Sequence, residues 1–203
     1  FLLTVQVTFF GILAGLGLGI LLAIVDMYGG KLASTIIKFY VEFFRGSPLV
    51  VQLFIFYYSV PNMFNILIDR FLVGFIVFAL NSAAYQKGYI KGAMEAVYED
   101  QMTAALSLGL SKAQAIRFVV LPQALRTVIP SWSNEFCSLA KSTAALLVIG
   151  VPELTSALMS IASWTWKVLE IYAFGALIYL IWISLMMKAL DILYNKVKIP
   201  GIE

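Results

Sequence analysis

The stretch FLLTVQVTFFGILAGLGLGILLAIV, residues 1–25, decides the class of this protein because it contains no charged residue. A helix needs about 20 consecutive apolar residues to cross the hydrocarbon core of a bilayer. The run is also too long for the hydrophobic part of a signal peptide. We therefore predict a membrane-spanning helix from Phe1 to Val25.

Four more spans follow when the charged residues are used to mark their ends. We expect the second to begin at Gly46, with Ser47 as the helix cap and Pro48 in the first turn. It should end near Pro61 and Asn62. The third span covers 71–86 and continues towards 94, the fourth covers 129–151, and the fifth covers 171–187. The sequence thus predicts an all-α integral membrane protein with five transmembrane helices.

The composition supports lipid as the main solvent of the chain. Of the 203 residues 62% are hydrophobic and only 12% are charged, and the mean hydropathy is +0.93. An average soluble domain carries about twice this share of charge. The chain has no histidine and a single cysteine, Cys137, so we expect no metal site and no internal disulfide. The net charge of +3 is too small and dispersed to indicate binding of nucleic acid.

The positions of the cations predict the orientation of the chain. If the N-terminus lies outside, the outer loops contain only Arg70 and Lys167. The inner loops and tail then contain Lys31, Lys38, Arg45, Lys87, Lys91, Lys112, Arg117, Arg126, Lys188, Lys196 and Lys198. Because cytoplasmic loops are enriched in Lys and Arg, we expect the N-terminus outside and the C-terminus in the cytoplasm. Residues 152–169 should then be an interfacial segment on the outer side.

The inner loop at about 95–126 predicts two short helices joined by a tight turn. Asp100 is expected to cap the first helix and Gly109 to end it in a left-handed conformation. Ser111 and Gln114 have the spacing of a capping box at the start of the second helix. Pro122 should end that helix near Leu121. Composition alone leaves a plain surface hairpin as the alternative.

Particular residues of this loop resemble the EAA loop of binding-protein-dependent ABC importer permeases. They are Gln101, Ala104, Ala105, Gly109, Leu110, Ser111, Phe118 and the run Val120-Leu121-Pro122-Gln123-Ala124. The stretches 45–53 (RGSPLVVQL), 134–136 (NEF) and 148–154 (VIGVPEL) resemble the polar amino acid branch of that family. The resemblance extends from about Phe1 to Asn195. One departure is Thr103, which stands where the loop usually has a glutamate.

The resemblance implies a MetI-like permease fold, with residues 1–203 forming a single transmembrane permease domain in a prokaryotic inner membrane. It also implies a second permease chain, identical or homologous, two ATP-binding subunits and an external solute-binding protein. The residues expected to couple to the ATPase are Gln101, Thr103, Ala104, Ala105, Gly109, Leu110, Ser111 and Pro122. The chain contains no GxxxxGK[ST] phosphate loop. We therefore expect it not to be an enzyme and to bind no cofactor, with ATP and Mg²⁺ on the partner ATPase.

Polar side chains inside a span usually face a bundle interior or a wet cavity. Two groups are predicted to line the substrate path: Asn81, Ser82, Tyr85 and Gln86 in the third span, and Lys141, Ser142 and Thr143 in the fourth. The Lys141 ammonium would neutralise a substrate carboxylate. Two alternatives stay open. Lys141 could instead pair with Glu135 or a partner's residue, and Asn81 and Gln86 could form hydrogen bonds between helices across a dimer.

Two departures from related permeases bear on the substrate. Gly88 stands where many relatives have a glutamate, and Ser142 where many have an aspartate. Fewer internal anions favour an acidic or neutral amino acid over a cationic one. The function predicted from the resemblance is an ATP-driven importer subunit for a polar amino acid.

Two other classes of protein compete with this interpretation. A stand-alone channel or secondary transporter is disfavoured because no inverted hydropathy repeat is evident. An intramembrane enzyme is disfavoured because the spans lack paired carboxylates and a nucleophile with a base. A smaller feature is the row Gly11, Gly15 and Gly19, which lies on one helix face and predicts close packing against another helix.

Overall fold

The computed structural model describes residues 1–198, apart from the side chains of residues 98–100. Every regular element in this part of the chain is helical. The α-helices are α1 (Leu2–Tyr28), α2 (Gly30–Gly46), α3 (Leu49–Phe54), α4 (Val60–Phe64), α5 (Arg70–Ser107), α6 (Lys112–Ala115), α7 (Leu121–Thr127), α8 (Ile129–Ser142), α9 (Leu154–Thr165) and α10 (Val168–Val197). Two π-helical turns, η1 (Ile55–Ser59) and η2 (Ile116–Val120), and one 3₁₀-helix, η3 (Thr143–Ile149), connect them.

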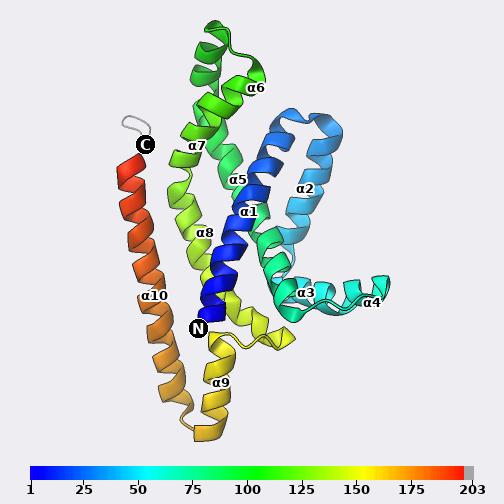
Figure 1. Cartoon of the computed structure of the whole chain (residues 1–203), viewed down its shortest axis with the longest axis vertical. Coiled ribbons are helices and arrows are strands. Elements are labelled where there is room, and N and C mark those ends of the chain that lie inside the picture. Colours follow the sequence, from blue (N-terminus) through cyan, green and yellow to red (C-terminus); the bar gives the residue numbers. More distant parts are fainter. Residues whose placement is uncertain (199–203) are drawn as a thin grey trace.

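The chain runs back and forth roughly along the long axis of the molecule through α1, α2, α5, α7–α8 and α10, in that order (Figure 1). By length and composition α1 and α10 are each apolar and long enough to span a membrane. Two bent pairs, α2 with Leu49–Phe64 and Ile129–Ile149 with α9, pass the same test together. This arrangement confirms the all-α membrane fold, and the helix count roughly fits the five predicted spans, with the long helix α5 beside the up to four spans that pass this test.

The second span lies elsewhere than the sequence predicted. The helix that returns beside α1 is α2, and the chain bends by 108° between Gly46 and Leu49. Ser47 and Pro48 are both extended, and Ser47 is so because a residue before proline avoids the helical region. Ser47 therefore does not cap the next helix; its hydroxyl donates to the Phe43 carbonyl at 2.6 Å. The segment α3–η1–α4 forms an arm that leaves the body sideways (Figure 1).

The other spans need smaller corrections. The third does not end near Met94, since α5 runs for 38 residues without a break. The fourth begins at Ile129 as predicted, but its last turns are the 3₁₀-helix η3, and a bend of 58° separates it from α9. The fifth is longer than predicted, from Val168 to Val197.

The glycine row of α1 packs closely on α5, as predicted. A Cβ atom added at Gly11 would lie 3.3 Å from the Phe78 side chain, and one at Gly15 would lie 2.9 Å from Gln86 Nε2. At Gly19 the added atom would meet the α5 backbone at the Lys87 nitrogen, 3.2 Å away. Only glycine lets the two helices approach this far. The α1–α5 pair is thus the central support of the fold.

Candidate functional site

The turn of the predicted coupling hairpin has the geometry that its sequence indicated. Gly109 has φ +82°, and Leu110 N–H bonds to Ala105 O while Gly109 N–H bonds to Leu106 O. These two bonds define a Schellman motif at the end of α5. Ser111 Oγ accepts the Gln114 N–H at 3.3 Å, and Gln114 Oε1 accepts the Ser111 N–H at 2.8 Å. The capping box is therefore confirmed, and the angle between the two helices is fixed locally.

Both outer ends of the hairpin differ from the prediction. The side chain of Asp100 lies outside the described residues, but the backbone of α5 is helical through position 100, so no helix begins there. Pro122 does not stop the second helix either. Leu121 N–H bonds to Ile116 O, five residues back, and this widened π turn lets the helix pass the proline. The hairpin is thus continuous with α5 on one side and with α7 and α8 on the other.

The hairpin has a buried side and an apolar exposed tip. Ala105 and Ala115 are buried where its two helices meet, and Gln123 Nε2 donates to Gln101 Oε1 at 3.1 Å. Ala104, Thr103 and Ser111 face outwards. The prediction placed both Ala104 and Ala105 against a partner, and the burial of Ala105 inside the hairpin corrects it. The hairpin exposes two large apolar side chains that sequence reasoning did not single out, Leu106 and Leu108, which is 83% exposed, together with Phe118 of the resemblance.

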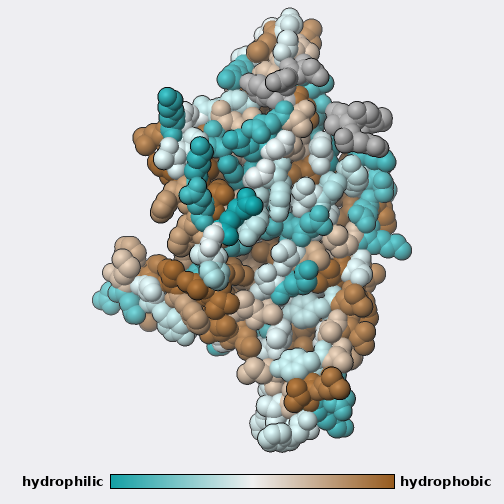
Figure 2. Space-filling view, turned by 180° about the vertical axis from the view of Figure 1, so that it is seen from behind, coloured by the Kyte–Doolittle hydropathy of each residue, from teal (hydrophilic) through white to brown (hydrophobic). Residues whose placement is uncertain are grey.

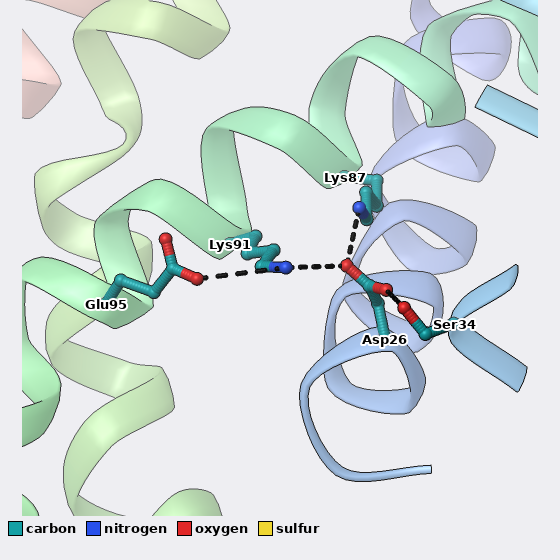
Figure 3. A network of polar contacts seen from close by, with 5 residues as sticks. All are labelled: Asp26, Ser34, Lys87, Lys91 and Glu95. Carbon is teal, nitrogen blue, oxygen red and sulfur yellow. Dashed lines mark hydrogen bonds and ion pairs between the residues drawn. The ribbon is translucent and has the colours of Figure 1, made fainter. Parts of the chain in front are cut away.

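A charged network joins α5, the helix that leads into the hairpin, to α1 and α2 (Figure 3). The Asp26 carboxylate of α1 receives Lys87 Nζ at 2.7 Å and Lys91 Nζ at 2.8 Å, both from α5. Its other oxygen accepts the Ser34 hydroxyl of α2 at 2.7 Å. The Asp26 side chain is only 1% exposed. Sequence reasoning treated these cations only as markers of orientation.

A polar cavity of about 240 Å³ lies where the end of α2 and the start of α3 meet α5 and α8. Three predicted path residues, Asn81, Tyr85 and Ser142, line it together with Glu135. Asn81 Nδ2 donates to Phe44 O and to Gln52 Oε1, both at 3.0 Å. The other lining residues are Ser47, Pro48, Leu49, Ser138 and Leu139. The cavity combines amide, phenol, hydroxyl and carboxylate groups, which suits a small polar ligand.

The other predicted path residues do not line this cavity. Ser82 Oγ donates to Glu135 Oε1 at 2.9 Å, and Gln86 bonds to Ile12 O and to the Trp132 indole, each at 2.9 Å. Thr143 Oγ1 donates to the Ala140 carbonyl within its own helix segment. Asn81 and Gln86 both form hydrogen bonds between helices of this one chain, whereas the alternative placed such bonds across a dimer. These three side chains hold the walls of the cavity in place.

Lys141 is exposed and not paired with Glu135, so the alternative of an ion pair between these two residues is not observed. Its side chain lies on the surface of the chain, and it makes no ion pair with any residue that the structure describes. Glu135 points from the same helix towards Ser82 instead. The side chains of Lys141 and Glu135 thus point to different sides of α8. The role of Lys141 in the substrate path stays a prediction.

Arg45 is the cavity neighbour that sequence reasoning missed. Its guanidinium lies 5.0 Å from the centre of the Tyr85 ring, and a Cβ atom at Gly88 would be 3.6 Å from its Nη1. Within the described part of the chain Arg45 has no ion-pair partner. The missing glutamate at position 88, noted in the sequence, is the signal that could have identified it. Among the described residues no group of acidic or cysteine side chains gathers as a metal site requires.

Known proteins are similar to this chain over most of its length. The glutamine transport system permease protein GlnP of Escherichia coli K12 is 35% identical over 180 residues, which cover 88% of this chain and 82% of the relative. A crystal structure of an amino acid ABC transporter with histidines is 32% identical, with a TM-score of 0.87 over 97% of this chain and 92% of that one. An inward-facing structure of the MetNI methionine ABC transporter has a TM-score of 0.76 at 19% identity over the same shares of the two chains. This more distant likeness confirms the MetI-like fold.

The family model agrees with these similarities. Residues 15–198 match the model described as "Binding-protein-dependent transport system inner membrane component". The match includes the hairpin, the charged network and the polar cavity. The chain therefore belongs to the family of inner membrane components of binding-protein-dependent transport systems.

Proposed function

We propose that this chain is the transmembrane subunit of an ATP-driven importer that moves a polar amino acid delivered by an external solute-binding protein. Its membership of the family and its likeness to a glutamine permease and to an amino acid ABC transporter support the substrate class. ATP and Mg²⁺ bind to separate ATP-binding subunits, two per importer, and this chain hydrolyses nothing. Residues 1–203 act as one permease domain.

A second permease chain covers a hydrophilic face of this one. In α2 the charged residues Lys31, Lys38, Glu42 and Arg45 recur at helical spacing on one side, and all are exposed. Figure 2 shows a row of hydrophilic side chains on the side where α2 lies, above the apolar arm of α3 and α4. Charged side chains on a membrane span are costly against lipid. A partner permease with a wet path between the two chains removes that cost.

The orientation rests on the cations at the hairpin end of the molecule, because Lys38 and Arg45, which the sequence placed in an inner loop, lie on the span α2. The hairpin and the C-terminal end of α10 lie at one end of the molecule (Figure 1), and the hairpin carries Lys112 and Arg117 at that end. Cytoplasmic loops are the ones enriched in basic residues. The hairpin and the C-terminus therefore face the cytoplasm, and the N-terminus faces outwards.

One observation carries the transport mechanism: α5 holds both the cavity and the coupling hairpin. Asn81 and Tyr85 lie on the same unbroken helix that ends at Ser107 and the Gly109 turn. At 1.5 Å per residue this helix is about 57 Å long. A displacement of the hairpin by the ATPase, which docks on the exposed tip at Leu108 and Phe118, therefore moves the cavity wall directly.

The charges around the cavity favour an amino acid as the ligand. Arg45 lies beside Tyr85 and forms no close ion pair among the described residues, although its charge interacts with that of Glu135. Glu135 lines the cavity with one oxygen bonded to Ser82. A zwitterion can place its carboxylate near the guanidinium and its ammonium near the carboxylate. Because Arg45 is not neutralised from position 88, the substrate is a neutral or acidic amino acid.

The substitution Gly88→Glu tests this assignment. A carboxylate introduced beside Arg45 should pair with it and compete with the substrate, so uptake should fall about tenfold or more, as expected for one charge-assisted contact. Gly92→Glu is the matched control, because no atom lies within 4 Å of a Cβ added there. Uptake of each labelled polar amino acid is measured in vesicles that contain the whole importer. Equal uptake by the two variants would contradict the role of Arg45, and no amino acid uptake by the wild type would contradict the function.

A further inference from the structure

A groove with an apolar floor lies between the last turns of α1 and the second helix of the hairpin. Its volume is about 580 Å³. It is lined by Ile24 and Tyr28 of α1, Lys112 and Ala113 of α6, Ile116 and Arg117 of η2, and Leu121 of α7. Neither the polar cavity nor the exposed tip of the hairpin includes these residues.

From the length of α1 and the position of its charges we expect the groove to lie at the depth where lipid headgroups meet hydrocarbon. With 27 residues α1 is about 40 Å long, which exceeds the hydrocarbon core of about 30 Å. The charged network at Asp26 lies on the same end of α1 as Tyr28 and marks the polar boundary. Ile24 lies about one helical turn before Tyr28, nearer the apolar middle of α1. Leu121 begins α7 directly after η2. The floor of the groove is thus within reach of acyl chains.

The rim of the groove is cationic. Lys112 Nζ lies 5.0 Å over the Tyr28 ring, and the Arg117 guanidinium lies 5.5 Å from the Phe118 ring. Both cations are exposed, and neither has an ion-pair partner among the described residues. No acidic side chain is found among the residues that line the groove in the described part of the chain. Basic pockets between transmembrane helices on the cytoplasmic side suit anionic headgroups.

We propose that this groove binds one anionic phospholipid of the cytoplasmic leaflet. The phosphate lies between Lys112 and Arg117, and an acyl chain lies against Ile24, Ile116 and Leu121. The bound lipid joins the end of α1 to the second helix of the hairpin and so helps to fix the hairpin for the ATPase. This inference rests on the cytoplasmic orientation that belongs to the proposed function.

The test is a lipid titration of the purified importer complex. Dioleoyl phosphatidylglycerol, dioleoyl phosphatidylcholine or inorganic phosphate is added in mild detergent, and the melting temperature is followed. The variant Lys112→Gln/Arg117→Gln is compared with the wild type and with Lys188→Gln/Lys196→Gln, which removes two exposed cations of α10. Each basic group near an anionic lipid contributes about fivefold in affinity, so the groove variant should bind phosphatidylglycerol about 30-fold more weakly.

The outcomes separate the possible occupants of the groove. Stabilisation of the wild type and the α10 variant by phosphatidylglycerol alone, lost in the groove variant, supports the proposal. Equal stabilisation by inorganic phosphate, or an unchanged response of the groove variant, overturns it. Loss of the ATPase from the groove variant with unchanged lipid binding also overturns it and assigns the groove to the ATPase. Since melting needs no transport, failure here leaves the proposed function standing.

Discussion

Removing Asp26 should destabilise the protein far more than removing any other acid of its network. In Asp26→Ala the two ammonium groups of Lys87 and Lys91 lose the carboxylate that lies 2.7 and 2.8 Å from them. The Lys87 side chain is only 10% exposed, so its charge is left without water or a counter-ion. Breaking a buried ion pair in this way costs about 3–5 kcal/mol.

The same network supplies the matched control. Glu95 is 57% exposed and lies 3.8 Å from Lys91, and an exposed pair of this kind contributes at most about 1 kcal/mol. For a chain of this size 1 kcal/mol corresponds to about 2–4 °C in melting temperature. Asp26→Ala should therefore lower the melting temperature by about 10 °C, and Glu95→Ala by about 3 °C or less.

The assay is thermal unfolding of the purified importer followed by tryptophan fluorescence, with Lys87→Met and the double variant Asp26→Ala/Lys87→Met as further samples. Since the double variant removes the stranded ammonium of Lys87, it should regain part of the stability lost in Asp26→Ala. Equal melting temperatures of Asp26→Ala and Glu95→Ala would refute the reasoning. So would a double variant whose loss is the sum of the two single losses.

Two further predictions concern packing and orientation. Gly19→Val should lower yield and melting temperature, because its Cβ meets the α5 backbone. Gly17→Val should be tolerated, because nothing lies within 4 Å of a Cβ added there. Similar melting temperatures of the two variants would contradict the close α1–α5 contact. A cysteine at Ser111, in a chain carrying Cys137→Ser, should resist membrane-impermeant thiol reagents in intact cells and react in inverted vesicles. Labelling from outside would reverse the proposed orientation.

The sequence predicted well those elements whose signals are local. The uncharged run to Val25 became α1, and the Gly109 turn followed from a backbone preference of one residue. The helix α2 was missed because its charges were read as loop residues, although they lie on one face of a helix. Pro122 was wrongly expected to end a helix, since a π turn in the preceding residues depends on tertiary packing.

The candidate site was predictable only in part. Asn81 and Tyr85 share a helix face, so their common position in the cavity follows from helical periodicity. The contact of Arg45 with Tyr85 depends on how α2 packs on α5, and the spacing of residues in the sequence does not reveal this packing. The exposure of Lys141 did not follow from the sequence, because the orientation of α8 decides which of its side chains face the rest of the chain.

The central claim is that this chain couples a partner ATPase to the movement of an amino acid. The most direct measurement records labelled amino acid uptake and ATP hydrolysis together in vesicles that hold the permease, the ATPase and the binding protein. The wild type should take up substrate only with hydrolysable ATP. Gly109→Val cannot easily adopt φ +82°, so uptake and the hydrolysis stimulated by the binding protein should fall together. Uptake without ATP, or full stimulation of hydrolysis in Gly109→Val, would contradict the account.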